Sequence, residues 1–331
     1  SFWFYLRFYL SCLQLLKMTS PIFKFPQPAE LDITLVIVSF NTREILLRCL
    51  GSIKKYTQEI SYEMILVDNA SEDGTVKAVV ELFPEINVIS NKDNRGFSAA
   101  NNQGIIESKG LRVAFLNPDT LLTENSFKKI IDFMEAHPEF SILGTGIVDE
   151  NNQPCPIRLW EDTPQDAALK IMGLYDPSDE LKKMGPMRAK EAKVISGCCF
   201  IVTRDLIESI GLMDENYFLY NEEDDLCRRA RKGGKKICFY PETSVQHLHG
   251  QSTHQERHRK KVMLESYRSN LYFYFKHYSF FWNIILRSLY KITLLLGLLR
   301  SSFRHLTGSA TADDSVSLKL KLLLMSSGKS R

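Results

Sequence analysis

Strand-like and helix-like segments alternate from residue 31 onward. Residues 33–40, ITLVIVSF, form a continuous apolar and mostly β-branched run, which is typical of a strand covered on both faces. The next segment has apolar residues at helical spacing, namely Ile45, Leu46, Cys49, Leu50 and Ile53. Further strands are predicted at 63–68, 86–90 and 111–116, with helices between them. This alternation predicts an α/β fold with a Rossmann-like, mainly parallel central sheet flanked by helices.

Polar residues follow each of these four predicted strands. In parallel α/β sheets ligands bind at the carboxyl ends of the strands, where these residues would lie together. Turns are rich in Asn and Asp in any protein, but four such ends on one edge favour a site for a base, a ribose, a diphosphate and a metal. The candidate residues are Ser39, Asn41, Asp68, Asn94, Arg95, Asn117 and Asp119. There is no GxGxxG or GxxxxGK[ST] motif, so neither a dinucleotide fold nor a P-loop is supported.

Charge and cysteine content exclude several classes of protein. The 331 residues include 42 Lys and Arg against 39 Asp and Glu, a net charge of +3. A generic nucleic-acid binder would be far more basic, so we expect no nucleic-acid partner. The seven cysteines form no CxxC pair, which favours a reducing compartment such as the cytoplasm.

Seven blocks of the sequence resemble one enzyme family in order and spacing between residues 33 and 253. They are VIVSFN, ILVDNASEDGT, NKDNRGFSAANNQGI, FLNPDT, ISGCCFIVTRD, MDENYFLYNEEDDLCRRARKGG and YPETSVQHLHGQST. The chain resembles inverting glycosyltransferases of family 2, which have a GT-A fold, and most of all their rhamnosyltransferase-like branch. The resemblance implies that Asn41 and Asp68 hold the base and ribose of a nucleotide-sugar, with Asn94 and Arg95 beside the nucleotide.

The resemblance also implies a divalent metal, Mg²⁺ or Mn²⁺, that binds the donor diphosphate. The family's DxD element is Asn117-Pro118-Asp119 here, so only Asp119 retains its acid, and His247 matches a family histidine that completes the metal shell. Such cations suit carboxylate, phosphate and imidazole ligands. His249 lies two residues further and would share a side of a strand with His247, although a solvated loop is the alternative. We expect His254 and His258 on a mobile basic loop.

Four acids stand together at the predicted start of a helix, Glu222 to Asp225. Acids are favoured in the first turn of a helix, but four of them repel one another. In the resembling family this block is acid-Asp-x-Asp before Leu-Cys, and its second acid is the catalytic base. That position is Glu223 here, and Asp225 is expected to support it by orienting the helix start or an acceptor hydroxyl. Crowding raises the pKa of Glu223 and the helix start lowers it, so the sequence leaves the balance open.

The remaining segments are less regular. Residues 149–193 are interrupted by prolines and show no clear period, and the basic run 228–236 is expected to favour the end of its helix electrostatically. Residues 278–299 are long enough for a membrane span but contain Arg287 and Lys291, so they predict an interfacial amphipathic helix. Residues 1–17 are expected to be upstream reading frame, with the true start at Met18, and the remains of a membrane anchor are the alternative. The predicted divisions are 1–31 (N-terminal extension), 32–253 (GT-A domain), 254–277 (basic loop and connecting helix) and 278–331 (C-terminal amphipathic helical extension and tail).

Together these features predict an inverting glycosyltransferase. It would transfer a sugar, plausibly rhamnose from a dTDP donor, to a saccharide or polyprenyl-linked saccharide acceptor in surface-polysaccharide synthesis. We expect it to be cytoplasmic and peripheral at the cytoplasmic face of the membrane. The alternatives are a sugar-nucleotidyltransferase, which would need a glycine-rich loop near its start, and a non-catalytic GT-A-like glycan-binding module.

Overall fold

The computed structural model describes residues 23–175, 188–248 and 256–306. The chain divides into two compact units, which we describe separately. The sheet unit comprises residues 18–161 and 183–255, and the helical unit comprises residues 1–17, 162–182 and 256–331. Some of the sequence predictions concern residues that the structure does not describe, namely residues 1–17, His249 and His254.

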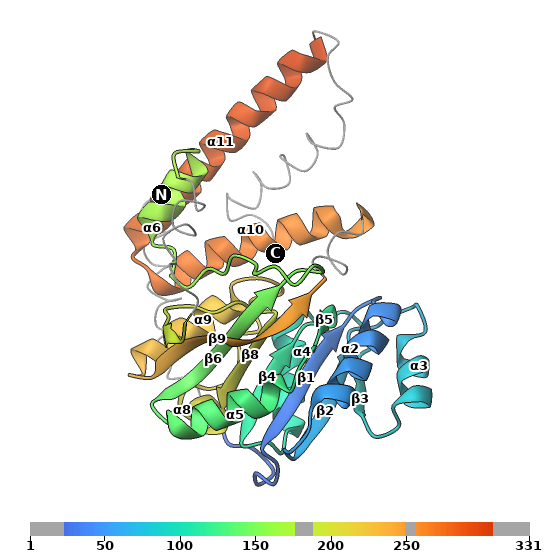
Figure 1. The fold of residues 1–331 in the computed structure, drawn as a ribbon. Helices are drawn as coiled ribbons and strands as arrows, with labels where there is room; N and C mark the ends of the chain where they lie inside the picture. Colours follow the sequence, from blue (N-terminus) through green and yellow to red (C-terminus); the bar gives the residue numbers. More distant parts are fainter. Residues whose placement is uncertain (1–22, 176–187, 249–255, 307–331) are drawn as a thin grey trace. The chain divides into compact units, whose positions relative to one another are not determined.

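The sheet unit is built on a nine-stranded mixed sheet (Figure 1). Its first four strands are parallel in the order β3-β2-β1-β4, as the alternation predicts. They are β1 (Ile33–Ser39), β2 (Tyr62–Asp68), β3 (Asn87–Ser90) and β4 (Arg112–Leu116). All seven residues of β1 are buried, which explains its continuous apolar sequence.

The other half of the sheet has antiparallel pairs that the sequence pattern did not predict. Its strands are β5 (Thr120–Leu121), β6 (Phe140–Val148), β7 (Lys190–Glu191), β8 (Cys199–Thr203) and β9 (Lys236–His247). β8 pairs antiparallel with both β4 and β6, and β9 pairs parallel with β6 and antiparallel with β5. The antiparallel β8 therefore links the parallel half of the sheet, through β6, to β9, the strand that carries His247.

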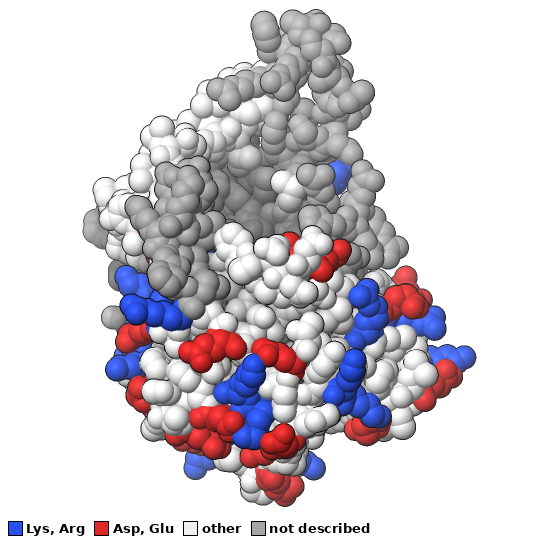
Figure 2. Space-filling model, in the orientation of Figure 1, with Lys and Arg blue, Asp and Glu red and all other residues white. Residues whose placement is uncertain are grey.

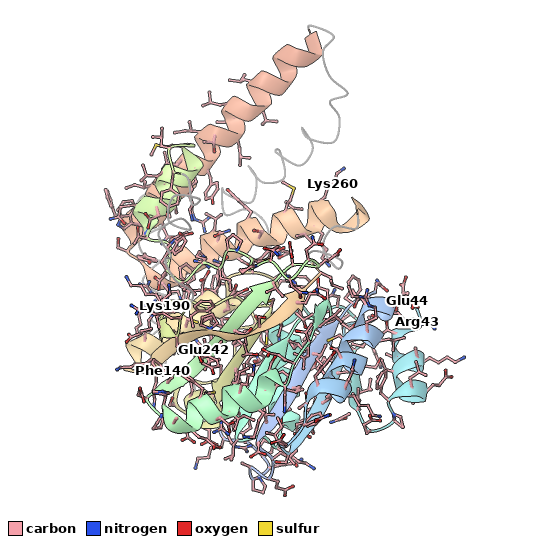
Figure 3. The ribbon with its side chains drawn as sticks, in the orientation of Figure 1. Arg43, Glu44, Phe140, Lys190, Glu242 and Lys260 are labelled. Atoms are coloured by element: carbon pink, nitrogen blue, oxygen red, sulfur yellow. The ribbon has the colours of Figure 1, made fainter. Side chains whose placement is uncertain are left out.

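Helices flank this sheet and bury their apolar stripes against it (Figure 1). They are α2 (Arg43–Tyr56), α3 (Thr75–Leu82), α4 (Phe97–Glu107), α5 (Ser126–Ala136), α8 (Arg204–Ile210) and α9 (Glu222–Lys232). In α4 the small residue Gly104 permits close approach to the sheet, because a Cβ there would lie 2.4 Å from a methyl carbon of Val36. At the first turn of α2, Arg43 and Glu44 lie on the outside (Figure 3).

The helical unit contains α6 (Pro164–Ile171), α10 (Glu256–His277) and α11 (Phe280–Leu306). Helix α6 lies in the segment without a clear period, and its start is a capping box between Thr163 and Asp166 followed by Pro164. That signal is local and was missed. The loop expected around His258 is helical instead, because α10 begins at Glu256.

Helix α11 has two apolar faces. One packs within the helical unit, where Leu286 is fully buried and Tyr290 stacks edge-on against Tyr267 of α10 with ring centroids 4.8 Å apart. The other face is exposed at Phe281, Ile284, Ile292, Leu295, Leu296 and Leu299. Residues Phe280–Leu299 are long and apolar enough to cross a membrane by length and composition alone.

Charged side chains of both signs are interspersed on the face of the molecule shown in Figure 2. No large single-sign field dominates the described surface of that face, in keeping with the small net charge.

Candidate active site

The carboxyl ends of β1 to β4 and the loops that follow form one edge of the sheet, here called the carboxyl edge (residues 39–41, 68–71, 91–96 and 117–120). Ser39 and Asp68 are neighbours in the register of β1 and β2. Asp68 is buried, and its Oδ2 accepts a hydrogen bond from Ser71 N at 2.9 Å. Among the described residues its buried Oδ1 has no hydrogen-bond partner. This oxygen is therefore available to a ligand at the edge.

The first two loops of the carboxyl edge are joined to each other. Asn41 N donates to Ser71 Oγ at 2.8 Å, and Asn41 Oδ1 accepts from Glu72 N at 2.8 Å. Asn41 and Ala70 both have positive φ, at 53° and 66°, a conformation that costs energy in residues other than glycine. The hydroxyl of Ser39 is fully buried and hydrogen-bonded with Thr42 Oγ1 at 2.9 Å. Ser39 therefore supports the loop from inside.

The third loop carries Asn94 and Arg95, and amide side chains hold it in place. Asn94 Oδ1 accepts from Gly96 N at 3.0 Å, while Asn69 Nδ2 donates to Gly96 O at 3.2 Å. Arg95 is exposed on this loop. Gly96 has φ of +86°, and a Cβ there would lie 2.8 Å from the backbone oxygen of Phe218. Only glycine fits this close approach of the loop to the segment that precedes α9.

The fourth strand end brings Asp119 to His247. His247 Nε2 lies 3.1 Å from Asp119 Oδ1, and both side chains are largely buried. The backbone fixes this pair, because Thr120 is opposite His247 in the β5–β9 ladder and Leu248 N donates to Asp119 O at 3.0 Å. The two residues are 128 positions apart in the sequence. The antiparallel return of β9 places them in contact.

These two side chains suit a divalent cation that is also held by a ligand. Within the described part of the chain, no group of three or more His, Cys, Asp and Glu side chains could hold a metal ion on its own. Mg²⁺ in particular commonly binds through one or two carboxylates together with substrate phosphates and water. One carboxylate and one imidazole therefore fit a cation that arrives with a diphosphate.

The carboxyl edge is connected to the start of α9 through the segment before β8. Asn117 N donates to Cys198 O at 2.9 Å. The adjacent Gly197 lies against Glu223, since a Cβ on Gly197 would be 3.5 Å from both the Cδ and Oε1 atoms of Glu223. The strand-end element 117–119 and the carboxyl of Glu223 therefore flank the same short piece of backbone. Sequence reasoning had assigned them to one site through the resemblance alone.

The four acids of α9 have different partners. Arg158 Nη2 donates to both carboxylate oxygens of Asp224, at 2.6 and 2.7 Å. Asn221 Nδ2 also donates to Asp224, at 3.1 Å. Asp225 is fully buried and pairs with Arg229 Nε at 2.7 Å. Arg229 in turn donates to backbone oxygens of Ile210 and Leu212. Asp225 thus lies in the packing of the helix start, and its supporting role in the site stays a prediction.

Glu222 and Glu223 are held differently. Each has a buried Oε2 without a hydrogen-bond partner among the described residues. Burial, followed by the charge of Asp224, raises the pKa of Glu223 to about 7, while Arg158 opposes this change. Burial and the neighbouring Glu223 raise the pKa of Glu222 well above its ordinary value. The balance that the sequence left open therefore favours a carboxyl that can hold or release a proton near neutral pH.

The backbone before α9 is also constrained. Tyr220 and Asn221 have consecutive positive φ values of 69° and 67°. The preceding segment is held by Asn102 of α4, whose Nδ2 donates to Met213 O at 2.9 Å and whose Oδ1 accepts from Met213 N at 3.0 Å. Such strain persists only where surrounding contacts determine it, and it is frequent at functional sites.

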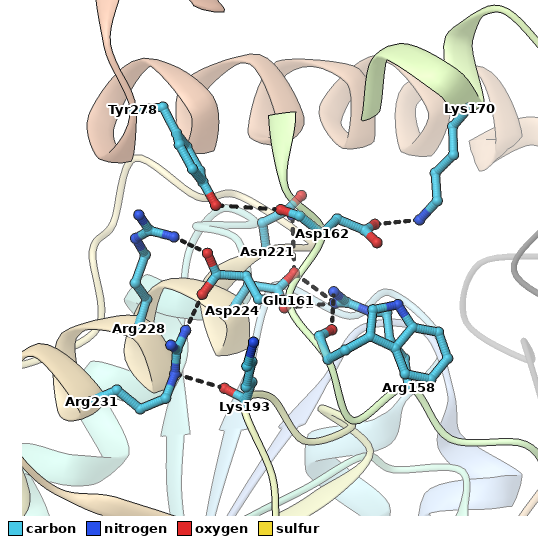
Figure 4. A network of polar contacts seen from close by, with 11 residues as sticks. Arg158, Glu161, Asp162, Lys170, Lys193, Asn221, Asp224, Arg228, Arg231 and Tyr278 are labelled. Atoms are coloured by element: carbon cyan, nitrogen blue, oxygen red, sulfur yellow. Dashed lines mark hydrogen bonds and ion pairs between the residues drawn. The ribbon is translucent and has the colours of Figure 1, made fainter. Parts of the chain in front are cut away.

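A second contact set fixes α9 to residues 157–161 of the irregular segment (Figure 4). Glu161 pairs through one oxygen with Arg228 and through the other with Arg231. Arg231 Nε also donates to Lys193 O at 3.1 Å. The end-of-helix arginines thus bind a specific carboxylate, whereas the sequence suggested only the helix dipole. The sequence did not predict the contacts of Arg158 with Asp224 or of Glu161 with the two arginines, because no local pattern links residues more than 60 positions apart.

Comparison with known proteins identifies the class of enzyme. Residues 34–211, more than half of the chain, match the model of the family described as "Glycosyl transferase family 2". The protein belongs to glycosyltransferase family 2 and is a glycosyltransferase. This membership favours the transferase over the nucleotidyltransferase and the non-catalytic module.

Curated relatives narrow the resemblance to the rhamnosyltransferase-like branch. The chain is 26% identical over 290 residues to an N-acetylglucosaminyl-diphospho-decaprenol L-rhamnosyltransferase of Mycobacterium tuberculosis, covering 82% of this chain and 94% of that protein. It is also 26% identical over 209 residues to a low-salt glycan biosynthesis hexosyltransferase of Haloferax volcanii, covering 61% of this chain and 62% of that one. The predicted family branch is therefore confirmed.

A solved structure confirms the fold. The crystal structure of GalNAc-T7 with UDP, GalNAc and Mn²⁺ matches with a TM-score of 0.53 at 17% sequence identity. The match covers 74% of this chain and 50% of the GalNAc-T7 chain. The sheet flanked by helices is the GT-A-like fold that the sequence predicted.

Proposed function

We propose that the protein is an inverting glycosyltransferase that moves rhamnose from a dTDP donor to a polyprenyl-diphosphate-linked saccharide. The observation that carries the proposal is the position of Glu223, whose pKa is raised. Glu223 lies against Gly197, and the backbone next to Gly197 is bonded to the strand-end element that places Asp119 beside His247. A donor-binding pair and a proton acceptor next to one backbone segment are the two parts that a single displacement needs. The choice of sugar and acceptor is supported by the activity for which the Mycobacterium tuberculosis relative is named.

In this proposal the carboxyl edge binds the donor. The free oxygen of Asp68 and the side chain of Asn41 contact the nucleoside, and Asn94, Arg95 and Asn117 line the path to the diphosphate. Asp119 and His247 would hold Mg²⁺ or Mn²⁺ against the diphosphate, and the cation would offset its negative charge. Ser39 acts from the interior by holding Thr42.

Glu223 is the proposed base. Its carboxylate accepts the proton of the acceptor hydroxyl as the hydroxyl oxygen forms a bond to C1 of the sugar. The bond from C1 to the diphosphate oxygen breaks on the opposite face, and the nucleoside diphosphate leaves with both electrons of that bond. The configuration at C1 is therefore inverted. A base with a pKa near the working pH is well matched to this step.

A donor screen tests the assignment of substrate. The full chain would be incubated with Mn²⁺, a polyprenyl-diphosphate N-acetylglucosamine acceptor and, in separate reactions, UDP-, GDP- and dTDP-sugars. We expect release of dTDP from dTDP-rhamnose, with product rhamnose of inverted configuration by NMR. Preference for another donor would correct the substrate, and product of retained configuration would contradict the mechanism.

We also propose that α11 binds the cytoplasmic face of a membrane. At 3.6 residues per turn its exposed apolar residues, Phe281, Ile284, Ile292, Leu295, Leu296 and Leu299, fall on one face of the helix, while Arg287 and Lys291 lie toward the flank of that face. This arrangement suits an interfacial helix with cations near anionic headgroups. A lipid-linked acceptor would then meet the enzyme at the membrane surface.

Flotation with anionic vesicles tests this membrane proposal. Residues Phe281 and Leu299 are both 67% exposed, and replacing both with Glu should release the protein from vesicles. Leu82 of the sheet unit is 60% exposed, so Leu82→Glu is a matched control that should still float. Deleting residues 278–331 should have the same effect as the double variant, and high salt should weaken binding of the intact chain. Equal recovery of all forms in the soluble fraction at low salt would contradict the proposal.

A further inference from the structure

We propose that Arg158 is a positioning residue of this active site, which acts through its ion pair with Asp224 to set the orientation and charge environment of the Glu223 carboxyl. This inference rests on the proposed function in which Glu223 is the base. In the family pattern the position of Asp224 is variable, and Arg158 belongs to the irregular segment 149–193, in which the sequence assigned no residue to the site. The pair is therefore outside the set of site residues that the resemblance implies.

The geometry of the pair is that of a fixed contact. One nitrogen of Arg158 lies 2.6 and 2.7 Å from the two oxygens of Asp224, whose side chain is only 6% exposed. A second nitrogen of Arg158 donates to Trp160 O at 3.2 Å, which ties the guanidinium to its own backbone. The pair is partly buried, with the Arg158 side chain 32% exposed, and charge-assisted hydrogen bonds hold direction as well as distance. Glu223 directly precedes Asp224 in α9, so the contact of Asp224 with Arg158 also restricts the backbone position of Glu223.

Several groups influence the charge of Glu223. On α9 itself, Asp224 is the anionic neighbour that raises the pKa of Glu223, and Glu222 is an adjacent carboxyl whose own pKa burial and Glu223 raise well above its ordinary value. Cys227 is a thiol whose pKa burial raises well above its usual range. From residues 157–161 comes the cation Arg158, which favours the ionised form of Glu223. In the segment before β8, Gly197 lies against Glu223. The next residue, Cys198, has a buried thiol that carries no charge at neutral pH. Arg158 and Asp224 therefore act on Glu223 with opposite signs.

A purely mechanical role for Arg158 is the competing explanation, and the structure offers a control for it. Glu161 joins the same segment to the same helix through Arg228 and Arg231. These arginines lie five and eight positions beyond Glu223 in α9. If the segment serves only as a brace, loss of either tether should have the same effect on the enzyme. If Arg158 acts on Glu223, only its own pair should change the ionisation that governs turnover.

The test is the pH dependence of turnover for the full chain and four variants, with dTDP-rhamnose as donor. Arg158→Gln should raise the apparent pKa of turnover by about 1 unit, and Asp224→Asn should lower it by about 1 unit. The double variant should return close to the wild-type pKa because both charges are gone. Glu161→Gln should lower the melting temperature while leaving the apparent pKa within a few tenths of a unit.

The outcomes separate the two proposals. Unmoved profiles in both Arg158→Gln and Asp224→Asn, or an equal movement in Glu161→Gln, would overturn the positioning role while leaving Glu223 as the base. If Arg158→Gln does not fold, Asp224→Asn still decides the sign, because asparagine keeps the shape of the side chain. Near-normal turnover of Glu223→Gln would instead overturn the proposed base itself.

Discussion

The carboxyl edge and the start of α9 hold their acidic side chains in different ways. At the edge, Asp119 faces His247 at 3.1 Å, and Asp68 has one bonded oxygen and one buried oxygen without a described partner. At α9, Asp224 and Asp225 are paired with arginines, while Glu222 and Glu223 are crowded and lack a full set of partners. Separate acids at the edge suit binding, whereas crowded acids with raised pKa suit proton transfer.

Removing the acid of the edge should have the largest effect. Asp119→Ala should abolish transfer, because the cation would lose its only carboxylate ligand from the protein in the proposed site. Calorimetry with Mn²⁺ should show strongly weakened binding of dTDP-rhamnose. Because the substitution also removes the buried contact with His247, the melting temperature is measured alongside to show that the variant is folded. Unchanged donor affinity in the presence of the metal would show that Asp119 is not at the diphosphate.

The proton acceptor at α9 should govern the pH dependence. Since burial and Asp224 raise the pKa of Glu223 to about 7, the active carboxylate is depleted below that pH. Turnover at saturating substrate should approach a tenfold fall per pH unit below pH 7, and so decrease roughly 50-fold from pH 7 to pH 5. The residual turnover of Glu223→Gln should lack this slope. A wild-type profile that is flat down to pH 5 would contradict the assignment.

The contact between the two regions can be broken at Gly96. Gly96 has a φ of +86°, and a Cβ there would lie 2.8 Å from the backbone oxygen of Phe218, so there is no room for a methyl group. Gly96→Ala should therefore destabilise the protein by about 2–4 kcal/mol, because strain and overpacking both add to the cost. Chemical denaturation measures this. Gly234→Ala is a control for positive φ without crowding, since nothing lies within 4 Å of its Cβ position, and it should cost less.

The smallest effect concerns stability. A Glu223 pKa that is higher in the folded than in the unfolded state means that the folded protein binds more protons between about pH 4.5 and 7, so stability falls as pH rises through this window. Above pH 7, Glu223→Gln should be more stable than wild type by on the order of 1–3 kcal/mol. Below about pH 4.5 the difference should vanish. Glu242→Gln, a change at an exposed acid on β9 (Figure 3), should show no such gain.

Much of the parallel half of the sheet could be predicted because its pattern is local. Strand β1 has an uninterrupted apolar sequence and is buried throughout, and the predicted strand at 111–116 corresponds to β4. The antiparallel strands could not be predicted in the same way, because β8 pairs with β4 and β6 across long stretches of chain. Helix α6 could have been found from its capping box, a signal that lies within four residues.

The candidate site divides along the same line. Residues at strand ends are found from sequence because strand order determines where they lie. The contact of Asp119 with His247 depends on the β5–β9 ladder and came only from the family resemblance. Arg158 and Asp224 are 66 positions apart, and charged residues at such separation have no pattern that selects one partner. Their pairing required the three-dimensional structure.

The most direct test of the account is to measure turnover and donor affinity together for Glu223→Gln. The amide keeps the shape of the side chain but cannot accept the proton. The account predicts that turnover falls by roughly 10²–10⁴-fold while the affinity for dTDP-rhamnose with Mn²⁺ stays nearly unchanged. Near-normal turnover of Glu223→Gln, together with loss of turnover in Asp224→Asn or Asp225→Asn, would place the base on a different carboxylate and contradict the account.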